Sequence, residues 1–484
     1  MTPLRPLSGK SLKYSLKSLP KALKEHRCTK YLQNYIHWRY LFIIWLSWFA
    51  LIHYYERIVV GRAMYNCLWH SWEQWPEEAA PHRVALLADP QIMDAYSYPN
   101  RPAPINWFTR QILDNYHRKN WVYINSYLGP DSVFFLGDLF DGGRYWGDDV
   151  WLKQYKRFNR IFTKRPNTLI VESLPGNHDI GFGNNVIQSS LQRFTSYFGD
   201  PNSLREVGNH TFVLLDSISL SNENNPEISS IPKNFVDSFN IMEQKYPRIL
   251  LTHVPLWRNS DHQSCGNKRE SKKPIPATAG DQYQTLISGE LTNTILSRFH
   301  PSVIFSGDDH DYCQVRHSYM ANGASVSADE ITVKSCAMNM GINRPAIQLL
   351  SLYNPSGKVS TDFDNPADRQ TYQTELCYLP DPYKSIKMYV IHGILSLILL
   401  VWMHCYPHSF NRKIAAKLNR HLASYSGVLL PISNKKNDSY SDGRKSSEKA
   451  YNVDVTNEKK IFWANSGILT LMVFLTFVYH YKSI

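Results

Sequence analysis

Three long apolar runs stand out from the shorter hydrophobic patterns of the chain. They cover residues 40–56, 388–406 and 461–480. A helix needs about 20 mostly apolar residues to cross a bilayer, and Trp and Tyr residues near the ends of a span suit the membrane interfaces. A buried core helix is the alternative for any one run. The first run is preceded by a stretch too long for a signal peptide. We therefore expect three transmembrane helices.

Basic residues gather beside these runs. Residues 1–39 carry a net charge of +8 and residues 407–460 carry +6, whereas the whole chain carries +12 and the remainder is therefore at −2. Under the positive-inside rule these two segments are cytosolic. The large central region and residues 481–484 then lie on the other side. Nucleic-acid binding is disfavoured, because the charge lies in membrane-flanking tails rather than on a folded domain.

The central region divides by composition into three parts. Residues 57–81 are a Trp-rich connector, residues 82–355 hold a folded domain, and residues 356–387 are a polar tether returning to the membrane. Asn209 begins an N-glycosylation acceptor in the folded domain. A second acceptor begins at Asn437 in the expected cytosolic loop, so we expect it to stay unmodified.

Five cysteines lie in the central region: Cys67, Cys265, Cys313, Cys336 and Cys377. Disulfides form in the oxidising compartment that this topology predicts. An odd number leaves at least one cysteine unpaired, and sequence alone does not define the pairing. We favour a bond between Cys265 and Cys313, with free buried thiols throughout as the alternative.

The folded domain contains five short apolar runs that predict buried strands. They read RVALLA, SVFFLG, TLIVES, RILLTH and SVIFSG, and each ends in or just before a polar cluster. In open α/β sheets, ligands bind outside the carboxyl ends of the strands. The pattern therefore predicts that the polar clusters meet at one edge and form an active site.

These clusters contain metal-binding side chains. They read Asp89-Pro90-Gln91, GDLFD ending at Asp141, GNHD ending at Asp179, Thr252-His253 and GDDH ending at His310. A lone Asp at a strand end is usually a turn or cap residue. Their shared strand context points instead to carboxylate, amide and imidazole ligands for two divalent ions. The absence of Cys argues against a closed structural zinc site.

The motifs GDLFDGGR, PGNHD, THVPL and GDDHDYC resemble the calcineurin-like metallophosphoesterase superfamily. The triplet DPQ, GDDH in place of GHxH, and residues 330–352 are similar to its endoplasmic-reticulum (ER) members. Those members are ethanolamine-phosphate phosphodiesterases that remodel the glycan of glycosylphosphatidylinositol (GPI) anchors. The resemblance covers about residues 82–355. It implies an α/β fold, a four-layer α-β-β-α sandwich with two mixed β-sheets.

The resemblance also implies a ligand set. The first metal would take Asp89, Gln91 and His310, the second Asn177, His253 and Asp308, with Asp138 bridging both. Gln91 and Asp308 stand where the superfamily usually has His. Oxygen ligands make the site harder, so we expect two Mn²⁺ ions rather than zinc. Direct coordination by Gln91 stays open, because an amide oxygen is a weak ligand.

By the same resemblance, a metal-bound hydroxide would attack the phosphorus while His178 protonates the departing alcohol. Asp141 would orient His178, for which a purely structural role is the alternative. Arg144, just after GDLFDGG, would pair with a phosphate oxygen or else is a surface arginine.

We therefore expect a phosphodiesterase of the ER membrane, with the Golgi as an additional location. It would hydrolyse ethanolamine phosphate from a mannose of a GPI-anchored protein or GPI lipid. One alternative is another membrane-associated phosphodiesterase or a phosphomonoesterase with the same two metals. The near-neutral central domain disfavours a monoesterase, whose doubly charged substrate needs extra cations. A non-catalytic ER-export adaptor is disfavoured by the intact ligand pattern.

Overall fold

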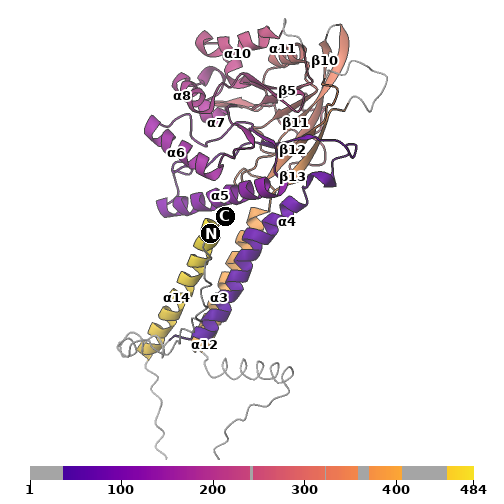
Figure 1. Cartoon of the computed structure of the whole chain (residues 1–484). Coiled ribbons are helices and arrows are strands. Elements are labelled where there is room, and N and C mark those ends of the chain that lie inside the picture. Colours follow the sequence, from indigo (N-terminus) through magenta and orange to yellow (C-terminus); the bar gives the residue numbers. More distant parts are fainter. Residues whose placement is uncertain (1–35, 240–243, 322, 358–369, 406–454, 484) are drawn as a thin grey trace, which may run out of the picture. The chain divides into compact units, whose positions relative to one another are not determined.

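The computed structural model describes residues 36–239, 244–321, 323–357, 370–405 and 455–483 (Figure 1). The chain forms two units. One contains Met1–Ile52 with Met388–Tyr479, and the other contains His53–Lys387 with His480–Ile484.

Three helices are long and apolar enough to cross a membrane: Trp38–Tyr65, Pro382–His404 and Lys459–Lys482. They comprise α3 (Trp38–His53) with η1 (Tyr54–Ile58) and α4 (Val59–Tyr65), then α12 (Pro382–Cys405) and α14 (Val455–Lys482). Within the first unit, the Trp45 indole donates to the Thr476 hydroxyl at 2.9 Å. Such polar contacts between helices are typical of membrane bundles. The expectation of three candidate membrane-spanning helices is confirmed.

The second unit contains a five-stranded mixed sheet in the order β13-β12-β1-β2-β3. Its strands are β1 (His82–Leu87), β2 (Ser132–Phe135), β3 (Leu169–Val171), β12 (Ala346–Leu352) and β13 (Tyr372–Tyr378). Strands β1, β2 and β3 are parallel. Strand β12 runs antiparallel to β1, and β13 runs antiparallel to β12.

A six-stranded mixed sheet has the order β10-β11-β9-β6-β5-β4. Its strands are β4 (Ser203–Val207), β5 (His210–Leu215), β6 (Arg248–Thr252), β9 (Val303–Ser306), β10 (Cys313–Ala321) and β11 (Ala324–Thr332). Strands β5, β6, β9 and β11 are parallel, and β4 and β10 are antiparallel edge strands. A separate ribbon pairs β7 (Ala279–Gly280) with β8 (Tyr283–Gln284).

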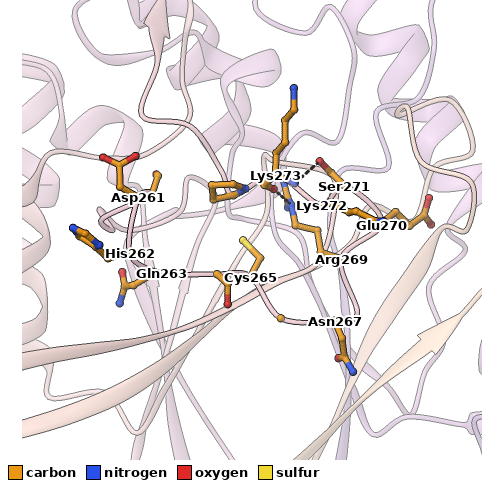
Figure 2. Close-up of a pocket in the computed structure, with 14 residues that line it drawn as sticks. Asp261, His262, Gln263, Cys265, Asn267, Arg269, Glu270, Ser271, Lys272 and Lys273 are labelled. Atoms are coloured by element: carbon orange, nitrogen blue, oxygen red, sulfur yellow. Dashed lines mark hydrogen bonds between the residues drawn. The ribbon is translucent and has the colours of Figure 1, made fainter.

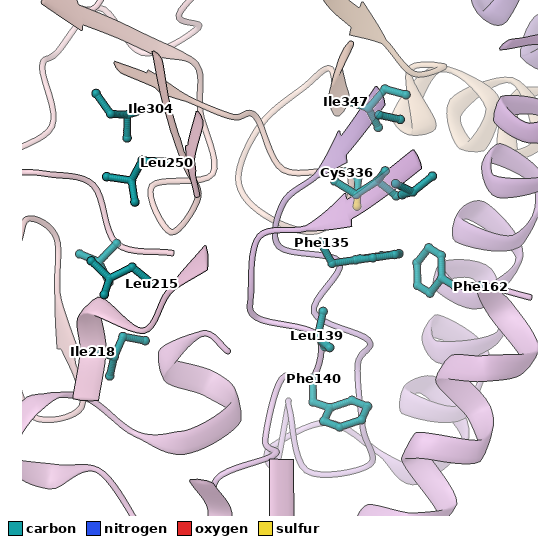
Figure 3. Packing of buried hydrophobic residues seen from close by; sticks show 14 of the residues in the cluster. Phe135, Leu139, Phe140, Phe162, Leu215, Ile218, Leu250, Ile304, Cys336 and Ile347 are labelled. Carbon is teal, nitrogen blue, oxygen red and sulfur yellow. The ribbon is translucent and has the colours of Figure 1, made fainter. Parts of the chain in front are cut away.

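Alternating side chains hold the layers together. Phe134 of β2 stacks on Phe212 of β5 at 4.5 Å between ring centroids, in the core between the two sheets. Its neighbour Phe135 packs instead against Phe162, which follows α6 (Asp148–Ile161) (Figure 3). Successive residues of a strand point to opposite faces, so one strand serves both cores. The expected α/β fold with two mixed sheets is confirmed.

Helices cover the outer faces of the sheets (Figure 1). The longer ones are α5 (Ala103–Tyr123), α6 (Asp148–Ile161), α8 (Gln188–Phe198), α10 (Pro226–Ser238) and α11 (Gly289–Phe299). Shorter helices lie between these elements: η2 (Trp69–Ser71), η3 (Ile124–Leu128), α7 (Asn177–Ile180), η4 (Gly183–Asn185) and α9 (Ser217–Leu220).

The folded domain extends beyond the boundary expected from composition. Residues 356–387 were expected to form only a tether, but Tyr372–Tyr378 form the edge strand β13. Without β13, strand β12 would be the outermost strand on this side of the sheet. Strand β13 pairs with the backbone groups that β12 would otherwise leave free. Its alternating polar residues hid it in the sequence.

Two disulfides stabilise the second unit. The expected bond between Cys265 and Cys313 is confirmed. A second bond, which we did not expect, joins Cys67 to Cys377 across a sequence separation of 310 residues. Cys336 is a buried free thiol, as the odd number of cysteines requires.

Candidate metal centre

The polar clusters follow the carboxyl ends of strands from both sheets. Asp89 and Asp138 come shortly after β1 and β2, and Asn177 comes a few residues after β3. His253 and Asp308 follow β6 and β9 of the other sheet. Because the parallel strands of the two sheets deliver their ends to one place, donors from distant parts of the chain converge.

The convergence is tight. Donor atoms of Asp89, Asp138 and His253 all lie within 4.8 Å of one another, and all three residues are buried. Nε2 of His253 lies 3.5 Å from Oδ1 of Asp138 and 3.5 Å from Oδ1 of Asp308. These distances are longer than those of ordinary hydrogen bonds. They leave room for a cation among the three side chains.

Three atoms that could bind a metal are buried here without a hydrogen-bond partner in the described part of the chain: Asp89 Oδ2, Asn177 Oδ1 and His253 Nε2. The His253 ring is oriented by its Nδ1, which donates to the Leu136 carbonyl at 2.7 Å and leaves the Nε2 lone pair free. The Asn177 amide nitrogen donates to the Gln282 carbonyl at 2.9 Å. Orphaned buried acceptors cost free energy, so this donor set fits bound divalent cations.

The charges support the same assignment. Burial raises the pKa of Asp89 well above its ordinary value, with His253 opposing and Asp138 adding to the rise. Burial also acts on Asp138, but His253 and His178 outweigh it and hold the pKa of that carboxyl below its ordinary value. Two buried carboxylates this close need a compensating positive charge to stay ionised together.

The backbone is strained at the same positions. Residues other than glycine with positive φ include Asp89 (49°), Gln91 (32°), Asp138 (50°), Asp308 (67°) and His310 (67°). Such conformations are uncommon for these residue types and cluster at functional sites. Here they turn the chain sharply after each strand.

Two motif glycines are required by close packing. A Cβ on Gly176 would lie 2.0 Å from Oδ1 of Asp138. Gly137 has a φ of 91°, and a Cβ there would lie 2.5 Å from Nδ1 of His253. Glycine at these two positions therefore lets the Gly137 loop approach His253 and the Gly176 loop approach Asp138.

The structure places the two atypical positions beside the carboxylates. The side-chain amide of Gln91 donates to Oδ2 of Asp138 at 2.6 Å. The backbone N–H of Asp308 donates to Oδ1 of Asp89 at 3.1 Å, which holds the Asp308 turn against the centre. Burial lowers the pKa of His310, opposed by Asp138 and Asp308. Short distances therefore bring together Asp89, Gln91, Asp138, His253 and Asp308. His310 lies within electrostatic range of Asp138 and Asp308. Asn177 precedes His178, whose backbone contacts Asp138.

His178 lies at the open side of the centre. Its backbone N–H donates to Oδ1 of Asp138 at 2.9 Å, and its Nδ1 lies 2.6 Å from the main-chain carbonyl of Asp141. The Asp141 carboxylate is further away, at 3.5 Å. Asp141 thus contacts the His178 ring chiefly through its backbone carbonyl.

A cavity of about 510 Å³ adjoins His178 and is lined by Asp141, Arg144, Tyr145 and Trp146 among others. Arg144 donates to the Asn177 carbonyl at 3.1 Å, and its guanidinium lies over the Tyr145 ring. Arg144 is therefore held at the cavity and can meet an anionic substrate.

Asp179 ties two of the motif loops together, a role that the sequence did not indicate. Its carboxylate accepts from the backbone N–H groups of Gly176, Leu139 and Phe140 at 2.9, 3.1 and 3.0 Å. Burial and the neighbouring Asp138 raise its pKa to about 7. The side chain therefore positions the GDLFD and GNHD loops against each other.

A buried network braces the other sheet. Glu330 accepts from the backbone N–H of Leu256 at 3.1 Å and from the Ser306 hydroxyl at 2.7 Å. It also pairs with Arg258 and His317 at 2.7 and 2.6 Å. The loops after β6 and β9, which carry His253 and Asp308, are thus held by one carboxylate.

A long loop between His253 and α11 also reaches the centre. Its Gln282 accepts from Asn177, and its Arg269 pairs with Asp309. Figure 2 shows the pocket of about 570 Å³ that this loop encloses. Long loops with little secondary structure are usually functional, so its length was the available sequence signal.

Comparisons with known proteins agree with this geometry. The family model described as calcineurin-like phosphoesterase matches residues 82–312. The chain is 53% identical over 447 residues to Cell division control protein 1 of Saccharomyces cerevisiae, covering 92% of this chain and 91% of that one. It is 26% identical over 303 residues to Metallophosphoesterase 1 of Mus musculus, covering 58% and 70%. This chain belongs to the calcineurin-like metallophosphoesterase family.

Proposed function

We propose that this protein is a phosphodiesterase that removes ethanolamine phosphate from a mannose of the GPI glycan in the ER lumen. The observation that carries the proposal is the set of orphaned buried donors on Asp89, Asn177 and His253. Carboxylate, amide and imidazole donors converging from two sheets are suited to metal-assisted phosphoryl chemistry.

The family resemblance implies the proposed ligands, and the convergence of Asp89, Asp138 and His253 supports them. Asp89, Gln91 and His310 would hold one ion, and Asn177, His253 and Asp308 would hold the other, with Asp138 between them. Oxygen-rich donors favour manganese. When bound, two such ions activate water and neutralise the charge on the phosphoryl oxygens. Gln91 would need to turn its amide oxygen inward to coordinate, because its nitrogen faces Asp138.

His178 is positioned to handle the leaving group. The hydrogen bond from Nδ1 to the Asp141 carbonyl leaves Nε2 available, and the side chain is 30% exposed beside the cavity. Water oxygen adds to phosphorus and one water proton passes to solvent. The bond from phosphorus to the mannose oxygen breaks, and that oxygen takes the proton from Nε2 of His178, which is then replaced from solvent. A positioned general acid contributes about 10²–10⁴-fold to the rate. Arg144 would hold a phosphate oxygen from the same cavity.

Two features support a GPI substrate. The sequence resembles the ethanolamine-phosphate phosphodiesterases of GPI remodelling. Candidate membrane-spanning helices precede and follow the folded domain along the chain. A membrane-attached enzyme is suited to a glycan that is itself attached to the bilayer. The charge distribution supports a cytosolic N-terminus and a lumenal domain.

The test uses purified full-length protein with manganese and a GPI glycan bearing ethanolamine phosphate, with product detected by mass spectrometry. We expect release by wild-type protein and loss of release in Asp138→Asn. Equal release by Asp138→Asn would refute the proposed centre. Hydrolysis of bis(p-nitrophenyl) phosphate without release from the GPI glycan would leave a phosphodiesterase with a different substrate.

A further inference from the structure

A second cavity, of about 420 Å³, lies within the folded unit away from the motif loops. One wall comes from Tyr54, Ile58 and Arg62 in the last turns of the helix Trp38–Tyr65, and the other from Tyr378 to Lys384 at the start of α12. Both walls therefore adjoin candidate membrane spans along the chain.

The helix Trp38–Tyr65 is longer than a bilayer core requires. Its 28 residues extend about 42 Å at the rise of an α-helix, against about 30 Å of hydrocarbon. Apart from Arg39 at its N-terminal end, its charged residues are Glu56, Arg57 and Arg62, which all lie in its C-terminal part. That part therefore belongs to the headgroup layer or beyond, which places this cavity at headgroup level.

The cavity is cationic. Arg62, Arg344 and Lys384 line it with one acid, Asp381. Among the described residues, neither Arg62 nor Lys384 forms a salt bridge. Arg344 lies 4.1 Å from the centroid of the Tyr378 ring. The Asp381 carboxylate is engaged in accepting the N–H groups of Tyr383 and Lys384 at the start of α12.

Apart from Asn66, the remaining lining is apolar or aromatic and includes Tyr55, Val59, Leu376 and Leu379. The Cys67–Cys377 disulfide joins the segment just after α4 to β13 beside the cavity, so the two walls are covalently linked. A small soluble anion would gain nothing from this apolar wall. The glycerol and upper acyl carbons of a lipid would be buried against it favourably.

Sheet topology relates the cavity to the metal centre. Tyr378 at the end of β13 pairs with Ala346 of β12, and Leu86 near the end of β1 pairs with Gln348. The ends of β13 and β1 therefore lie at the same edge of the sheet. They are two strand spacings apart, or about 10 Å. A headgroup in the cavity would lie on the side of the domain that carries Asp89.

We infer that this cavity binds the headgroup of an anionic phospholipid. Three cations against one engaged carboxylate complement a net negative headgroup, and each cation near a membrane surface strengthens such binding. Tyrosines are favoured at this depth of a bilayer. Binding is measured without turnover, so this inference can fail while the proposed function stands, and the reverse.

The test titrates purified full-length protein in detergent with dioctanoyl phosphatidylserine and counts bound lipid by native mass spectrometry. We expect Arg62→Gln/Lys384→Gln to bind at least about tenfold more weakly than wild type. The matched control Lys272→Gln/Lys273→Gln removes two exposed lysines of the long loop and should bind as wild type does. Arg344→Gln, assayed alone, should weaken binding as well.

Other outcomes overturn the inference. Unchanged affinity in Arg62→Gln/Lys384→Gln, with an unchanged unfolding midpoint, would exclude the cavity as the site. Equal binding of dioctanoyl phosphatidylcholine would show that headgroup charge is not recognised. Displacement of the lipid by inorganic phosphate at equal concentration would indicate a free-anion site instead.

Discussion

At the scale of single residues, the centre depends on polar atoms that the protein itself leaves unsatisfied. Two of the proposed ligands use one atom for positioning and keep another free: His253 donates to a carbonyl through Nδ1, and Asn177 donates to one through its nitrogen. His178 differs, because it is partly exposed and faces a cavity. This difference in burial separates the residues expected to hold metal from the residue expected to move a proton.

We expect His178→Ala to retain bound manganese while turnover falls about 10²–10⁴-fold, because in the proposed mechanism the ring donates a proton but holds no ion. Metal content by mass spectrometry and steady-state hydrolysis measure the two effects separately. His70→Ala, at an exposed histidine, is the control and should behave as wild type. Unchanged turnover in His178→Ala would refute the role.

His210 makes stability depend on pH. Burial lowers its pKa to about 4, from an ordinary value of 6.5. The unfolded chain therefore takes up a proton that the folded protein excludes between these values. This site should lower the free energy of unfolding by about 3 kcal/mol as pH falls from about 6.5 to about 4.

Denaturant unfolding of wild type and His210→Gln at pH 7 and pH 4 measures this effect. The variant keeps the glycosylation acceptor but lacks the titrating ring. We expect it to lose less stability on acidification than wild type does. The same pH dependence in both proteins would contradict the assignment.

At the scale of elements, strands deliver ligands and disulfides hold the surrounding segments. The Cys265–Cys313 bond anchors the long loop to the start of β10, and the Cys67–Cys377 bond joins the segment just after α4 to β13. Their sequence separations are 48 and 310 residues. Closing a longer loop removes more conformational entropy from the unfolded chain.

Replacing either pair with serines should lower the free energy of unfolding by about 2–5 kcal/mol. The loss should be about 1–2 kcal/mol larger for Cys67→Ser/Cys377→Ser, because its loop is longer. Each variant removes two buried cysteines, so one controls for the other. Equal losses in denaturant unfolding would show that loop length does not govern the difference.

At the scale of the whole molecule, the chain combines a folded domain with three candidate spans. Asn209 is an exposed turn residue of the β4–β5 hairpin, where Gly208 and Asn209 both have positive φ. Asn437 lies outside the described residues. The two acceptors report on opposite sides of the membrane in the topology that we propose.

We expect Asn209→Gln to abolish a glycosidase-sensitive mobility shift of the protein expressed in eukaryotic cells. Asn437→Gln, the matched control, should leave the shift unchanged, because its loop would face the cytosol. A shift that depends on Asn437 would reverse the proposed orientation.

The apolar runs and the polar clusters were predictable from sequence because both are local. The five predicted strands are all present as β1, β2, β3, β6 and β9, and their buried runs need no partner to be recognised. The candidate ligands follow those strands directly, so Asp89, Asp138 and His253 were identified from their motifs. The spans were evident for the same reason.

Contacts between distant residues were decided only by the tertiary structure. Strand β13 has no apolar run of its own and exists because β12 offers it an edge. The use of the Asp141 carbonyl, the bracing by Asp179 and the approach of Gln282 depend on loops separated by many residues. The sequence by itself determined which side chains stand at the strand ends. Strand pairing within the two sheets determined which atoms these side chains present, because that pairing sets the backbone direction at each turn.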